Sequence, residues 1–362
     1  EHGRDSIIVG VPGTYPITQP VQGQLISSFL TPDIGSEYTW PRELKNEIAG
    51  IVDDYMVDVR GFRTDNKQWL LDQIYEMTDK RFTVVKHLLK TKPWDLFFMV
   101  EMGVDRIHHG FWSFMDPEHH RYEPGNPFEN AIHDYYVHTD RLIGEALELI
   151  DRDKTAIWIV SDHGAKTMVG GFCINDWLMR EGYLHMKQSP TPGQKFSVND
   201  VEWSKTRAWG EGGYYGRLFI NVEGREPNGT VPQSGYERFR DEIKSKIEAV
   251  KDHKGERMGN VAHRPQDLYE QINGVAPDLL CIFGELRWRS VGTLGHDSVH
   301  TFENDTGPDD ANHAQEGMYI LCDPSRSPAG RCDEATLYDV APTILKTLNI
   351  PAPPHMRGHS LT

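Results

Sequence analysis

Short apolar runs alternate along the chain with longer segments in which apolar residues recur at helical spacing. The runs predict strands buried on both faces at Ile7–Val11, Trp94–Val100, Ile157–Val160 and Gly317–Leu321. Helices are predicted at Lys67–Leu89 (one long helix or two abutting ones), Phe128–Ile150, Ile174–Gly182 and Leu337–Leu348. Strand, helix and strand in succession is typical of an α/β protein, so we expect a central, mostly parallel sheet with helices on both faces.

Between about residue 187 and residue 300 the pattern changes, because proline and glycine become frequent. Two strand-like pieces, Arg217–Asn221 and Asp278–Phe283, flank a charged helical segment, Tyr236–Val250. We interpret residues 187–300 as an inserted α+β cap subdomain. Residues 1–186 would then form the first part of the α/β core, and residues 301–362 would complete it.

The composition narrows the class of protein. A formal net charge of −16 over 362 residues argues against a general nucleic-acid binder, which usually carries a basic face. No apolar run approaches the about 18 residues of a spanning helix, so we expect no membrane partner. The four cysteines form no CxxC pair, which favours reduced thiols and a cytoplasmic location, with a Cys322–Cys332 disulfide as the alternative.

An acid and an imidazole stand side by side where one predicted strand ends. Asp162 and His163 directly follow Ile157–Val160, and open α/β sheets bind ligands outside the carboxyl ends of their strands. Such a pair can bind a divalent metal ion. Taken alone, the pair is more typical of a helix N-cap aspartate beside a surface histidine, and the other segments of the chain favour the metal site.

Two further segments place similar side chains beside predicted strands. Asp105 and His109 follow the Trp94–Val100 run four residues apart, so they share one face if a helix begins near Asp105. His313 lies in a loop before the Gly317–Leu321 run. Oxygen and nitrogen ligands without thiolates suit Zn²⁺ or Mn²⁺. Five such ligands exceed one tetrahedral site and supply most of a two-metal centre, the arrangement used for displacement at phosphorus.

The order of these motifs resembles that of the alkaline phosphatase superfamily, in particular its type I phosphodiesterase/nucleotide pyrophosphatase branch. The chain is most similar to the group of predicted phosphohydrolases and phosphomutases within that superfamily. The resemblance covers nearly all of the chain. It is carried by Asp-x-x-x-His, Ser-Asp-His-Gly and the later histidine, and by these stretches: Pro12–Pro16, Trp209–Arg217, Gly224–Pro227, Asp305–His313, Asp339–Ile344 and Met356–Leu361.

The resemblance implies two divalent metal ions, zinc or alternatively manganese. One would be held by Asp105, His109 and His313, and the other by Asp162 and His163. It also implies an additional aspartate ligand and a threonine or serine nucleophile, both of which we expect upstream of Glu1. We expect Thr14 to be a loop residue near the pocket. The chain as given is then expected to bind the second metal weakly and to turn over substrate poorly or not at all.

The activity implied by the resemblance is hydrolysis of a small-molecule phosphate ester through a covalent phospho-enzyme. Arg217 and Arg225 of the cap would bind the part of the substrate that is not transferred, or they form ordinary ion pairs. A phosphomutase or phosphomonoesterase on the same scaffold, and a non-catalytic metal-binding relative, stay open as alternatives. A sulfatase is disfavoured, and the sequence leaves the oligomeric state, including a homo-oligomer, undecided.

Overall fold

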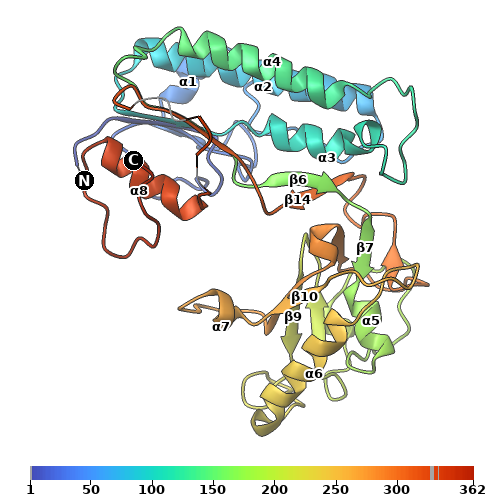
Figure 1. The fold of residues 1–362 in the computed structure, drawn as a ribbon. Coiled ribbons are helices and arrows are strands. Elements are labelled where there is room, and N and C mark those ends of the chain that lie inside the picture. The colour runs from blue at the N-terminus through green and yellow to red at the C-terminus, as the bar shows by residue number, and fades with distance from the viewer. Residues whose placement is uncertain (1, 327–329, 333) are drawn as a thin grey trace.

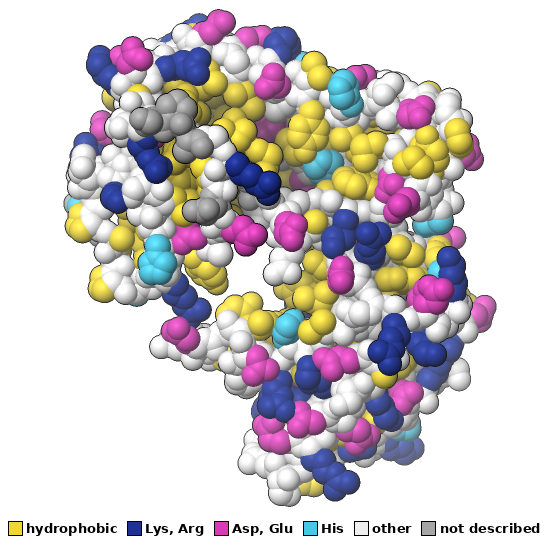
Figure 2. All heavy atoms as spheres, in the orientation of Figure 1, with side chains coloured by type: hydrophobic (Ala, Val, Ile, Leu, Met, Phe, Trp, Pro, Cys, Tyr) yellow, Lys and Arg dark blue, Asp and Glu magenta, His cyan; other side chains and the backbone are white. Residues whose placement is uncertain are grey.

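The computed structural model describes residues 2–326, 330–332 and 334–362. Its elements form two bodies, which β6 (Gly164–Thr167) and β14 (Ala311–Ala314) join as an antiparallel pair (Figure 1). The surface is hollowed between the two bodies, and acidic and basic side chains gather along the upper edge of this hollow (Figure 2). Helices and strands occur throughout both bodies, so the protein is of the mixed α/β class that the hydrophobic pattern predicts.

The upper body contains a four-stranded sheet in the order β3 (Thr39–Trp40), β2 (Gly23–Ile26), β1 (Ser6–Val9) and β4 (Leu96–Met99). The central strand β1 runs parallel to both β2 and β4, and β3 is an antiparallel edge. The strands predicted at Ile7–Val11 and Trp94–Val100 are thus neighbours in a parallel arrangement, as the strand–helix–strand pattern indicates.

The start of the chain bears on the predicted nucleophile. Glu1 lies outside the described residues. The structure does not test the nucleophile or the additional aspartate ligand, so both stay predictions. The first described strand, β1, begins at Ser6.

Helices of the upper body are α1 (Leu44–Ala49), α2 (Lys67–Thr91), α3 (Gly103–Met115), α4 (Ala131–Leu147) and α8 (Leu337–Thr347). The segment predicted as one helix or two is the single helix α2. Its residues Val84 and Leu88 pack in one core with Ile7 and Val9 of β1. α2 and α4 lie on one side of the sheet and α8 on the other (Figure 1).

The strand before Asp162, β5 (Ile157–Val160), pairs antiparallel with β15 (Tyr319–Cys322), Val160 opposite Tyr319. This pair is separate from the four-stranded sheet. Ile159 and Ile320 are 36% and 51% exposed, and Phe98 of β4 is 43% exposed, so the prediction that these strands are buried on both faces is wrong for the described residues.

The lower body is built around an antiparallel sheet in the order β10 (Val261–His263), β11 (Leu279–Ile282), β9 (Gly216–Ile220) and β8 (Ala208–Glu211). A smaller sheet has the order β12 (Trp288–Val291), β7 (Gly170–Cys173) and β13 (His300–Thr301). The helices are α5 (Ile174–Arg180), α6 (Tyr236–Glu248) and α7 (Pro265–Leu268), with short 3₁₀ turns at Val198–Asp200, Gln233–Gly235 and Gly284–Leu286.

A single apolar core holds the lower body together. It extends from Phe172 and Trp177 to Phe239 of α6 and Leu294. The strands and the helix predicted within residues 187–300 form, and β7 and α5 pack with them. Where the cap subdomain begins stays a prediction.

Two observations bear on the chain's surroundings. No helix in the described parts of the chain is long and apolar enough to cross a membrane. All four cysteines are free: Cys173 and Cys281 are buried, and Cys322 and Cys332 are exposed.

Candidate metal centre

Helix α3 carries the first two predicted ligands. Asp105 lies in its first turn, and Nε2 of His109 lies 3.3 Å from Oδ1 of Asp105. The two residues therefore share one helix face, as their spacing predicts. His108 points elsewhere, because its Nε2 lies 3.1 Å from the hydroxyl of Tyr136 on α4.

The Ser-Asp-His-Gly segment forms the tight corner between β5 and β6. The backbone N–H of Met318 donates to Oγ of Ser161 at 2.6 Å. A Cβ on Gly164 would lie 2.3 Å from the carbonyl oxygen of Glu316, and one on Gly317 would lie 2.4 Å from Oγ of Ser161. Only glycine permits such close approach, so the serine and both glycines hold the corner against the segment that leads to β15.

His313 is brought to this corner by strand pairing. The sequence predicts a loop at His313, but the residue lies on β14, opposite Ala165 of β6. The rings of His163 and His313 consequently stack, with centroids 3.9 Å apart and planes 17° apart. Two residues 150 positions apart in the chain thus become neighbours through the register of one antiparallel pair.

Three of the five predicted ligands converge on one point. Asp105, His163 and His313 each offer an atom that lies within 4.8 Å of those of the other two. His109 is beside them, its ring centroid 5.4 Å from that of His313. Asp162 is more peripheral: its side chain is 75% exposed, and its Oδ2 lies 3.6 Å from Nε2 of His163. A carboxylate and imidazoles so close together fit a Zn²⁺ or Mn²⁺ ion.

Charged groups around the cluster fix its ligands. Nδ1 of His109 lies 2.7 Å from Oδ1 of Asp309. The Asp309 side chain is fully buried, and its Oδ2 accepts from Nε of Arg63 at 3.2 Å. Arg106 donates to Asp105 at 2.6 Å and forms a two-point pair with Asp58 at 2.8 and 2.7 Å. Outer-shell carboxylates of this kind orient ligating imidazoles.

These supporting residues were not predicted from the sequence. Asp309 stands four positions before His313, inside the Asp305–His313 stretch noted only for its resemblance. The ring of Tyr214 lies 4.1 Å from that of His313, and Tyr214 belongs to the Trp209–Arg217 stretch noted only for its resemblance. A buried aspartate facing a distant histidine leaves no local sequence signal that could reveal it.

The cluster holds its groups in different charge states. Burial alone would raise the pKa of Asp105, but the hydrogen bond to His109 and nearby positive charges outweigh burial and lower it. Burial alone would lower the pKa of His109, yet hydrogen bonds to Asp105 and Asp309 raise it to about 9. Burial and the neighbouring His163 and His109 lower the pKa of His313 to about 4. At neutral pH, His313 therefore offers an unprotonated nitrogen to a metal ion.

The two predicted substrate-binding arginines lie in the lower body. Arg225 donates to both carboxylate oxygens of Asp278 at 2.7 Å, and that carboxylate is 2% exposed. Arg217 forms an ion pair of 2.9 Å with Glu211, in which both side chains are nearly half exposed. It also lines a cavity of about 290 Å³ together with Tyr215 and Tyr269. Their contact with substrate stays a prediction.

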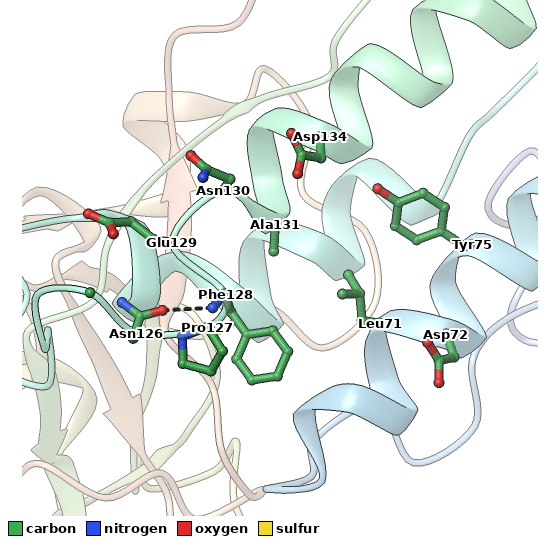
Figure 3. Close-up of a pocket in the computed structure, with 11 residues that line it drawn as sticks. Leu71, Asp72, Tyr75, Asn126, Pro127, Phe128, Glu129, Asn130, Ala131 and Asp134 are labelled. Carbon is green, nitrogen blue, oxygen red and sulfur yellow. Dashed lines mark hydrogen bonds between the residues drawn. The ribbon is translucent and has the colours of Figure 1, made fainter.

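Another cavity, of about 420 Å³, lies in the upper body between α2 and the start of α4 (Figure 3). The side chains of Asp72, Glu129 and Asp134 line it with Tyr75. None of the predicted metal ligands lines this cavity, so it is distinct from the candidate centre.

Comparison with models of protein families shows to which family the chain belongs. The model of the family described as type I phosphodiesterase/nucleotide pyrophosphatase matches residues 1–309. The chain belongs to this family. The match includes Asp105, His109, Asp162 and His163 and stops just before His313. Family membership implies phosphodiesterase- or pyrophosphatase-type hydrolysis of phosphoesters. A comparison with curated protein sequences gave no match.

Proposed function

We propose that the protein is a metal-dependent hydrolase of small-molecule phosphoesters, of the phosphodiesterase or nucleotide pyrophosphatase type. One observation carries the proposal: Asp105, His163 and His313, from three separate segments, bring their ligand atoms within 4.8 Å of one another in a chain of this family. All three residues are partly buried, and bringing acids and imidazoles together there is costly without a bound cation, because the charged groups lose part of their hydration.

The proposed centre has two parts. Asp105, His109 and His313 hold one divalent ion, and Asp162 and His163 hold the other, with zinc preferred and manganese as the alternative. When bound, such ions supply positive charge for the phosphoryl oxygens and lower the pKa of the attacking group. The two sets of ligands lie close enough to share one site, because the ring centroids of His163 and His313 are 3.9 Å apart.

The chain's own residues then have definite roles. Asp309 holds the Nδ1 side of His109, which directs Nε2 toward Asp105 and the centre. Arg106 fixes the Asp105 carboxylate from the opposite side. In the lower body, the guanidinium of Arg217, which lines the cavity of about 290 Å³, binds the part of the substrate that is not transferred.

The proposal includes the arrangement of the whole chain. The four-stranded sheet and the β5–β15 pair would belong to one alkaline phosphatase-like core made of residues 1–186 and 301–362. Residues 187–300 would be the inserted cap subdomain. This arrangement places the centre at the junction of the two bodies, where β6 and β14 meet.

The test is hydrolysis of bis-p-nitrophenyl phosphate by the chain as given and by a version extended at its N-terminus, each with Zn²⁺ or Mn²⁺ and with a chelator. We expect metal-dependent turnover by the extended version and little or none by the chain as given. Asp105→Asn should lower kcat/KM by more than the about 100-fold that loss of an outer-shell partner can cost, whereas Asp140→Asn, an exposed aspartate on α4, should have no effect. Metal binding by the extended version without hydrolysis of any phosphoester would overturn the proposal and favour a non-catalytic relative.

The same assay separates the related activities. Turnover of p-nitrophenyl phosphate in place of the diester would indicate a phosphomonoesterase. Transfer of the phosphoryl group to an added alcohol in preference to water would indicate a phosphomutase.

A further inference from the structure

A second group of metal-ligating side chains lies in the lower body, apart from the centre described above. Cys173 is the last residue of β7, Asp176 lies in the first turn of α5, and His296 follows β12 in the loop of residues 292–299. Each offers an atom that lies within 4.8 Å of those of the other two. The proposed hydrolysis uses none of the three.

The surroundings of this group are largely closed to solvent. Cys173 is fully buried and Asp176 is 3% exposed. The Asp176 carboxylate accepts from the backbone N–H groups of Gly295 and His296 at 2.9 and 3.4 Å, and each oxygen keeps a further lone pair. Nε2 of His296 lies 2.9 Å from Oγ1 of Thr293, a contact of the kind that orients ligating imidazoles.

In the metal-free protein, Cys173 and Asp176 hold their protons more tightly than usual. Burial raises the pKa of the Cys173 thiol to about 12, and the nearby carboxylates of Asp176 and Asp305 add to the effect. Burial likewise raises the pKa of Asp176, despite its two backbone hydrogen bonds. A divalent ion would reverse both effects, because it pairs with the carboxylate and deprotonates a coordinating thiol.

We propose that Cys173, Asp176 and His296 bind one zinc ion that fastens the loop of residues 292–299 to β7 and α5. Thiolate, imidazole and carboxylate are ligands that zinc accepts together, at about 2.3 Å for sulfur and about 2.0–2.2 Å for nitrogen and oxygen. These bond lengths place ligand atoms about 3.3–3.6 Å apart in a tetrahedron, a modest contraction of the observed group. Zinc binding releases the thiol proton to solvent.

The loop that this ion would fasten is connected to the candidate metal centre. It continues from β12, where Ser290 and Gly213 exchange backbone hydrogen bonds of 2.8 and 2.9 Å. Gly213 precedes Tyr214, whose ring lies against His313. The zinc ion therefore supports the segment that carries Tyr214 without contacting the centre itself.

Cobalt substitution tests the proposal, because only this site includes a thiolate. Purified protein, stripped of metal and titrated with Co²⁺, should show a thiolate-to-cobalt charge-transfer band in the near ultraviolet. Cys173→Ser should abolish the band, and Cys322→Ser, at an exposed cysteine outside the group, should keep it. Asp105→Asn should also keep it, so failure of this site and failure of the hydrolytic centre are distinguishable.

His296→Ala provides a second variant should Cys173→Ser fail to fold, because His296 is only partly buried. We expect it to fold, as judged by circular dichroism, and to bind Co²⁺ at this site at least about tenfold more weakly. A chelator should lower the Tm of the parent protein by more than that of His296→Ala, because the variant can lose only the ions of the hydrolytic centre. The proposal is overturned by a folded parent without the band at saturating Co²⁺, by a band that survives in Cys173→Ser, or by unchanged affinity in His296→Ala.

Discussion

The Nδ1 atom of His109 lies 2.7 Å from Oδ1 of Asp309, although the two residues are 200 positions apart in the chain. Asp309 is fully buried, and Arg63 supports its other oxygen. The carboxylate thereby fixes the orientation of the imidazole, so that Nε2 faces Asp105 and the centre. An interaction of this kind keeps a ligand in place before the metal arrives.

Asp309→Asn is therefore expected to weaken Zn²⁺ or Mn²⁺ binding by about 10–100-fold, because His109 loses the charge that orients it. Isothermal titration would measure the affinity. Asp310→Asn is the matched control, since Asp310 is equally buried but contacts Ser113 and Arg121 through its side chain. An equal loss of affinity in both variants would show that the effect is merely structural.

The pKa of His109, raised to about 9 from its ordinary 6.5, predicts a loss of stability in alkali for the metal-free protein. Because the folded protein holds the proton more tightly than the unfolded chain, the contribution is complete below pH 6.5 and disappears as the pH rises through 9. Urea unfolding with a chelator would measure it. The difference in unfolding free energy between the parent and His109→Gln should shrink as the pH rises from 6.5 through 9. A difference that stays constant over this range would contradict the prediction.

His313 should behave in the opposite way, because its pKa is lowered from 6.5 to about 4. The folded protein binds this proton less readily than the unfolded chain. The stability that the neutral ring contributes is therefore complete above pH 6.5 and lost as the pH falls through 4. Proton NMR of the metal-free protein would follow the C2–H resonance, assigned by its absence in His313→Gln. A midpoint near 6.5 would contradict the prediction.

Gly164→Ala should disrupt the corner that carries Asp162 and His163, because the added Cβ would lie 2.3 Å from the carbonyl oxygen of Glu316. We expect a loss of about 1–3 kcal/mol in unfolding free energy, as is usual for overpacking. Gly144→Ala, inside α4, meets nothing within 4 Å. It should be neutral or stabilising by up to about 1 kcal/mol. Equal urea midpoints for the two variants would contradict the account of the corner.

Arg225 and Arg217 should differ when each is replaced by alanine. Arg225→Ala leaves the buried Asp278 with only Tyr236 and the backbone of Ile220 as donors, and should cost about 1–3 kcal/mol of stability. Arg217→Ala removes an exposed pair and should cost at most about 1 kcal/mol. If Arg217 binds substrate, its loss raises KM for the diester while urea stability stays nearly unchanged. An unchanged KM would remove Arg217 from the proposed site.

The sequence by itself determined the elements and the types of ligand. Periodicity and β-branched runs placed α2, α4, β1 and β5 close to their observed bounds, because these patterns reflect local preferences and burial within one element. The spacing of Asp105 and His109 on one helix face was equally local, and the structure confirms it.

Only the tertiary structure decided which of these residues meet. The pairing of β6 with β14 stacks His163 on His313, and the loop before β14 brings the buried Asp309 to His109. Pairing also sets β5 and β15 apart from the four-stranded sheet, against the prediction of strands buried on both faces. Such contacts join segments more than a hundred residues apart, and their register depends on packing of the whole chain, which no local pattern of residues encodes.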